Sequence, residues 1–118
     1  MDDLKQQFGK IDVNDAVIAQ VVGFAVTESY GIVGMVSQRA ILDGIFDLLG
    51  RDNLAKGISI QRNQEEIILD IYVSVVYGTK ISRICQNVQE KVRYTLQETF
   101  SLQAKAINIH VVNVRMND

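Results

Sequence analysis

Histidine and cysteine are the side chains that most often do chemistry near neutral pH, and this chain has one of each. His110 lies in an alternating stretch, in phase with Asn108 and Val112, and no second ligand-type residue stands near it at metal-binding spacing. A metal site needs three or four ligands, and nucleophilic catalysis needs a serine or cysteine beside a base. No spacing ties His110 to Cys85 or to a serine. The sequence therefore predicts a satisfied or surface histidine and no catalytic, metal-binding or cofactor-binding residue.

Two other groups of reactive type have simple structural interpretations. Glu65 and Glu66 resemble a pair of catalytic carboxylates, but adjacent residues of a hairpin point to opposite sides of a sheet, so we expect a solvated turn. Cys85 lies on an apolar helical stripe, where a free thiol packs as a small hydrophobic group. Neither group of residues indicates catalytic activity.

The segment Gly31-Ile32-Val33-Gly34 allows three interpretations. Two helices flanking a Gly-x-x-Gly turn, followed by a hairpin and a long helix, is also the element order of an RNA-binding KH domain, in which this turn clamps the nucleotide backbone. Such turns carry lysine or arginine between the glycines, whereas here Arg39 is the nearest cation. The alternatives are structural glycines, which we favour, and a hydrophobic turn that docks on a partner.

Length and composition indicate one ordered domain that spans residues 1–118, of which the first seven can be disordered. Twelve basic against fourteen acidic residues give a net charge of −2, so no overall positive field gathers nucleic acid or anionic lipid. The N-terminus lacks the basic and apolar regions of a secretion signal, and no run of apolar residues is long enough to span a bilayer. These features predict a cytoplasmic protein.

The first half of the chain alternates short strands and helices. Residues 9–13 predict a strand, and Asp12 or Asn14 can cap a largely apolar helix that runs to about Ser29. Residues 30–35 predict a tight turn or short strand. Residues 39–49 predict an amphipathic helix that ends at Gly50, with Ile41, Leu42, Ile45, Phe46 and Leu49 facing inward.

The second half contains the clearest patterns. Residues 58–61 and the alternating residues 67–77 predict an antiparallel hairpin, whose second face carries Ile68, Asp70, Tyr72, Ser74 and Val76. Thr79 can cap a helix with an apolar stripe from Ile81 to Thr99. Residues 105–115 predict a last strand with a bulge near Val111, or a strand that is apolar on both faces. The fold class is α+β: a small, mostly antiparallel sheet covered mainly on one face by helices, in the order β-α-(short strand or turn)-α-β-β-α-β.

The whole pattern resembles the alkaline shock protein family, the envelope stress response proteins of Gram-positive bacteria. The resemblance rests on residues 9–13 (GKIDV), 30–35 (YGIVGM), 57–58 (GI), 70–73 (DIYV), 77–81 (YGTKI), 87–92 (NVQEKV) and 111–114 (VVNV). It implies a small cytoplasmic protein without known enzymatic activity, from the short subgroup of the family. It also implies peripheral attachment to the inner membrane face through a membrane-anchor protein, or a partner from lipid metabolism.

We therefore expect a non-catalytic interaction or scaffold protein in the envelope stress response or lipid-linked homeostasis. We expect it to form a dimer or larger homo-oligomer, because the first helix and the second face of the hairpin carry more apolar surface than one small core can bury. A KH-like nucleic-acid binder is the alternative, and a carrier of a small acyl ligand is the third hypothesis. The candidate partner interface consists of Tyr30, Gly31, Ile32, Val33, Gly34, Met35, Arg39, Ile68 and Tyr72.

Overall fold

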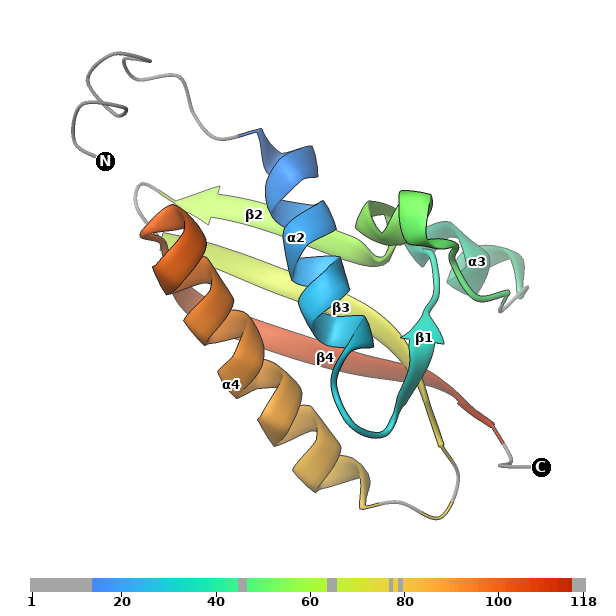
Figure 1. Cartoon of the computed structure of the whole chain (residues 1–118). Coiled ribbons are helices and arrows are strands. Elements are labelled where there is room, and N and C mark those ends of the chain that lie inside the picture. The colour runs from blue at the N-terminus through green and yellow to red at the C-terminus, as the bar shows by residue number, and fades with distance from the viewer. Residues whose placement is uncertain (1–13, 45–46, 64–65, 77, 79, 116–118) are drawn as a thin grey trace.

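The computed structural model describes residues 14–44, 47–63, 66–76, 78 and 80–115 (Figure 1). Its elements follow in the order α2 (Asp15–Thr27), β1 (Ile32–Met35), α3 (Gln38–Asp43), the 3₁₀ helix η1 (Arg51–Gly57), β2 (Ile58–Asn63), β3 (Glu66–Val76), α4 (Ile81–Phe100) and β4 (Gln103–Arg115). The fold is α+β, as the sequence predicts. The expected strand at residues 9–13, the caps Asp12 and Thr79, Glu65 and the first seven residues lie outside the described residues.

Strand β3 is the centre of the sheet. β2 pairs with its first half and β1 with its second half, both antiparallel and along the same edge. β4 pairs with the whole of the other edge and runs parallel to β3, because α4 crosses back over the sheet between them. The register skips Val112 between Val73 and Ser74, which confirms the predicted bulge near Val111. The predicted antiparallel hairpin of β2 and β3 is also confirmed.

Helices α2 and α4 lie side by side across one face of the sheet (Figure 1). The Oδ1 atom of Asn14 accepts a hydrogen bond from the backbone N–H of Ala16 at 2.7 Å, which starts α2 as predicted. The opposite flank of α2 packs against η1, where Leu54 Cβ lies 2.7 Å from the position that a Cβ of Gly23 would occupy. The helix is thus buried on two sides, as its sequence indicates. The fully buried core consists of Ile18, Val22, Val26, Met35, Ile67, Leu69, Ile71, Val73, Val75, Ile84, Val88, Val92 and Leu96.

The amphipathic helix predicted over residues 39–49 is confirmed as far as Asp43 and wrong beyond it. Ile45 and Phe46, expected to face inward, lie outside the described residues. α3 ends at Asp43, and Gly44 adopts a φ of +75°, which ends the helix. Beyond it the backbone N–H of Leu49 donates to the carbonyl oxygen of Met35 at 2.8 Å, and Leu48 pairs with Val36. Leu42, expected to face inward, is 87% exposed. Pairing with the end of β1 overrides the helical pattern, and Gly50 precedes η1 rather than ending a helix.

Helix α4 and the turn after it agree with the sequence pattern. Its predicted inward stripe is buried at Ile84, Val88, Val92 and Leu96. Ser101 then adopts a φ of 55°, and its N–H reaches the end of the helix, so the chain turns directly into β4. Lys91 Nζ lies 3.5 Å from Oε2 of Glu28, the residue that caps the C-terminus of α2, and joins the two helices at the surface. The helices and their aliphatic core therefore hold β3 and β4 in a fixed register.

Candidate interaction surface

The second face of the sheet lies opposite α2 and α4, behind the strands in Figure 1. β3 presents Ile68, Asp70 and Tyr72 there, all of them half-buried. Parallel pairing with β4 places Ala106, Asn108 and His110 directly beside these three residues on the same face. We call these six residues the open face. It combines apolar, aromatic and hydrogen-bonding side chains on two rigid neighbouring strands.

A compact polar cluster forms the centre of the open face. His110 Nε2 lies 2.9 Å from Asp70 Oδ1, and Asn108 Nδ2 donates to the same oxygen at 3.2 Å. The rings of Tyr72 and His110 stack with centroids 4.7 Å apart and planes inclined by 15°. The side chain of His110 remains 43% exposed, whereas that of Asp70 is 19% exposed. These contacts confirm a satisfied histidine, and they fix the orientation of both rings.

The cluster lacks the arrangement that nucleophilic catalysis needs. Ser74 lies two residues beyond Tyr72 on β3, but its hydroxyl is buried without a hydrogen-bond partner, so it is not joined to His110. Cys85 belongs to α4, on the opposite side of the sheet. Within the part of the chain that the structure describes, no three His, Cys, Asp or Glu side chains gather into a metal site. The arrangement supports recognition through stacking and hydrogen bonding.

Cys85 provides a direct test of how α4 is packed. Burial raises the pKa of its thiol above the ordinary value, so a smaller fraction is thiolate at a given pH than in an exposed cysteine. We expect iodoacetamide at pH 8 to alkylate the folded protein several times more slowly than the same protein in denaturant. Equal rates would show that α4 does not shield the thiol; mass spectrometry over time measures both rates.

The residues predicted from sequence to form an interface lie in separate places. Ile68 and Tyr72 lie together on the open face, and Tyr30, after α2, is 79% exposed. Arg39 is exposed on α3, with its Nε 4.0 Å from Asp43 Oδ2. Met35 is fully buried in the core. The others are Gly31, Ile32, Val33 and Gly34, which lie in or next to β1 and are half-buried or buried.

The Gly-x-x-Gly segment does not form a protruding loop between two helices. Gly31 closes the turn after α2 with a φ of +87°, and a Cβ there would lie 2.3 Å from Ile84 Cδ1. Gly34 is buried in β1 opposite Ser74 of β3. This geometry favours structural glycines over a backbone clamp for nucleic acid.

Sequence reasoning noted Asp70, Asn108 and His110 separately but did not bring them together. Alternation along each strand places Asp70 beside Tyr72 and Asn108 beside His110 on one face. The two pairs come together only because β3 and β4 are parallel neighbours in the sheet. The sequence of one strand does not show which other strand lies beside it. The alternation of side chains along each strand was the only sequence signal that could have indicated this surface.

Among the described residues, no helix is both long and apolar enough to cross a membrane.

Comparison with known proteins shows the family of this chain. A model of the alkaline shock protein 23 family, described by a cell envelope-related function, matches residues 3–116. YloU of Bacillus subtilis is 41% identical over 116 residues, which cover 98% of this chain and 97% of that protein. Spy1614 of Streptococcus pyogenes is 40% identical over 92% of this chain and 89% of its own length. YqhY of Bacillus subtilis is 31% identical over 99% and 85%. No solved structure matches the chain significantly. The chain therefore belongs to the alkaline shock protein 23 family, whose function is related to the cell envelope.

Proposed function

We propose that this protein is a non-catalytic interaction module that binds a protein partner through its open face and serves the cell envelope. The observation that carries the proposal is the preformed stack of Tyr72 on His110, held by Asp70 on the face that also carries Ile68. Aromatic side chains with a polar tip are enriched where proteins bind one another. A rigid pair costs little conformational entropy on binding.

The chemistry of the open face favours a protein over a membrane or a nucleic acid. It carries one carboxylate, which is already paired with His110, and no lysine or arginine. Phosphate-rich partners are attracted by clustered positive charge. A partly exposed mixture of aliphatic, aromatic and amide groups around a single carboxylate instead matches a protein surface with a hydrophobic centre and a polar rim. In this proposal, the partner brings the protein to the inner face of the envelope.

Site-specific photo-crosslinking in living cells of the native host tests this function. Benzoylphenylalanine in place of Tyr72 is expected to form a discrete adduct with one protein. The same group in place of Tyr94, which is 66% exposed on α4, serves as the matched control and should not give that adduct. The partner identified at Tyr72 should then bind Tyr72→Ala at least tenfold more weakly in purified form, as expected for an aromatic anchor.

Two results would contradict the proposal. One is the absence of any protein adduct at position 72 while the protein remains folded by circular dichroism. The other is an identical set of adducts at positions 72 and 94, which would indicate that the contacts do not depend on the open face.

A further inference from the structure

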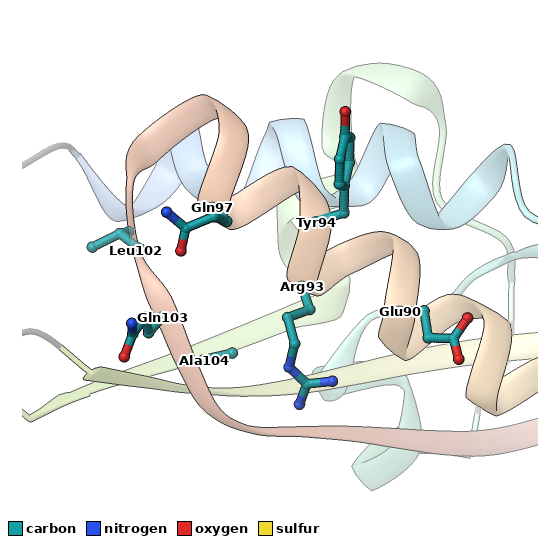
Figure 2. Close-up of a pocket in the computed structure, with 7 residues that line it drawn as sticks. All are labelled: Glu90, Arg93, Tyr94, Gln97, Leu102, Gln103 and Ala104. Atoms are coloured by element: carbon teal, nitrogen blue, oxygen red, sulfur yellow. The ribbon is translucent and has the colours of Figure 1, made fainter.

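The outer edge of β4 is the longest unpaired strand edge among the described residues. β4 spans 13 residues and pairs with β3 along one side only. Unpaired N–H and C=O groups along such an edge are a template for another strand. Figure 2 shows α4 above the start of β4, with Arg93 reaching from the helix toward the strand. This edge is separate from the open face, so an inference drawn from it does not depend on the function proposed above.

Hydrogen bonds reveal which backbone groups of β4 face outward. Gln89 Nε2, on α4, donates to the carbonyl oxygen of Ile107 at 2.7 Å. Along a strand of a parallel pair, the backbone N–H and C=O of one residue point toward the paired strand, and those of the next residue point away from it. On β3 the carbonyl oxygen of Tyr72 accepts from Val36 N–H at 3.1 Å, so Tyr72 faces β1 and Ile71 faces β4. Ile71 pairs with Ile109 and so bonds the residues on either side of Ile109. From this pairing and the bond from Gln89, we infer that Ile107, Ile109 and Val111 turn their backbone groups outward. A carbonyl oxygen accepts two hydrogen bonds, so the bond from Gln89 leaves this group available.

Register shifts limit the regular part of this edge. The pairing with β3 skips Lys105 on one side and Val112 on the other, which leaves residues 106–111 as an unbroken ladder. Bulges bend and twist a strand, so a second strand fits best between them. The three outward residues are centred on Ile109.

We propose that β4 pairs antiparallel with β4 of a second copy across a two-fold axis at Ile109. Ile109 then lies opposite itself, and Ile107 of each copy lies opposite Val111 of the other. All three outward residues form hydrogen-bonded pairs in this register, about six backbone bonds in total. An axis at a neighbouring residue pushes at least one pair into a bulge. The two sheets become one continuous sheet.

The residues around the axis favour a copy of this chain as the occupant. A two-fold contact brings each side chain near its own copy, so a charge close to the axis repels itself. Residues 106–111 contain no Lys, Arg, Asp or Glu. On α4, Ser82 and Gln86 share the face of Gln89 by helical spacing and are uncharged as well. Arg93 lies on the same face one turn further on, beside the start of β4 and away from the axis. No charged side chain of residues 106–111 therefore opposes its own copy at the axis.

Packing at this edge is also incomplete in the single chain. Ile109 and Val111 lie on the helix-covered face but are only half-buried. Pairing at the axis covers Ile109 with its own copy and Val111 with Ile107 of the partner. A surface hollow of about 550 Å³ lies between α4 and the start of β4, next to Leu102 and Ala104 (Figure 2). It leaves room for the end of the partner's strand.

Cysteine crosslinking tests the register. In a Cys85→Ser background, Ile109→Cys should form a disulfide-linked dimer on mild oxidation, since directly opposite residues have Cα atoms about 5.5 Å apart. Ile107→Cys alone should not, because its two copies lie roughly 13 Å apart along the strands. A mixture of Ile107→Cys and Val111→Cys should crosslink to each other. Ile60→Cys, on β2 at the opposite edge of the sheet, is the matched control and should stay unlinked.

Sedimentation equilibrium tests the contact without a covalent bond. The wild-type protein should have twice the chain mass of 13.2 kDa. Gln86→Glu, which places like charges near the axis, should weaken the dimer at least tenfold, and the weakening should shrink in high salt. Gln61→Glu, exposed on β2, should have no effect. A monomer at millimolar concentration overturns the proposal. A dimer in which Ile109→Cys fails to crosslink overturns it too, because the copies then meet elsewhere.

Discussion

Replacing Ile71 by alanine is expected to lower the free energy of unfolding by about 2–5 kcal/mol, the usual cost of deleting a buried aliphatic side chain. Ile71 is fully buried at the centre of β3 and lies opposite Ile58 of β2 and Ile109 of β4. The loss combines the transfer free energy of the missing atoms with the cavity that they leave. Urea unfolding followed by circular dichroism measures the change.

A leucine-to-alanine substitution at an exposed position serves as the control for the effect of burial. Leu42, on α3, is 87% exposed, so Leu42→Ala should change the free energy of unfolding by no more than about 0.5 kcal/mol. The assignment of β3 as the central strand would fail if the two substitutions had similar effects. It would fail equally if Ile71→Ala cost less than the surface variant.

Gly31→Ala is expected to destabilise the protein by about 2–6 kcal/mol, from two additive causes. Its φ of +87° strains any residue with a Cβ, at about 1–3 kcal/mol. The new Cβ also lies 2.3 Å from Cδ1 of Ile84, which is buried between the helices, and overpacking of this kind costs about 1–3 kcal/mol. Chemical denaturation measures the sum.

Two other glycines of the same chain separate these causes. Gly44 has a φ of +75° and open space where a Cβ would stand, so Gly44→Ala carries the backbone strain alone. Gly50, with a φ of −72° and the same open space, carries neither cause, and Gly50→Ala should be neutral or slightly stabilising. A Gly31→Ala protein as stable as the wild type would contradict both causes.

The sequence predicts the parts of the fold in which one periodicity persists over many residues. The alternation of β3 and the stripe of α4 leave no other arrangement of their apolar residues, and both are observed. The prediction that the helix continues past Gly44 was wrong for the opposite reason. Its helical spacing is real but short, and the backbone pairing of Leu49 with Met35 outweighs it. The cap at Asn14 and the bulge at Val112 were predictable because each depends on local chemistry.

The candidate surfaces were predictable only in part. Ile68 and Tyr72 follow from alternation, and family motifs such as residues 30–35 indicated the family that the comparisons show. The Tyr72–His110 stack and the outward edge at Ile109 depend on which strand lies beside β3 and in which direction it runs. That information is distributed over the whole core, because α4 must cross the sheet before β4 can pair.

The parallel pairing of β3 with β4 also affects how the chain matures on the ribosome. β3 emerges before α4, yet the strand that covers its long second edge emerges only after all of α4 has been made. Until then the nascent chain exposes an aliphatic strand that is open to association with neighbouring polypeptides. Contacts between segments so far apart in sequence form slowly. Slow translation or chaperone capture in that interval should therefore affect the yield of native protein.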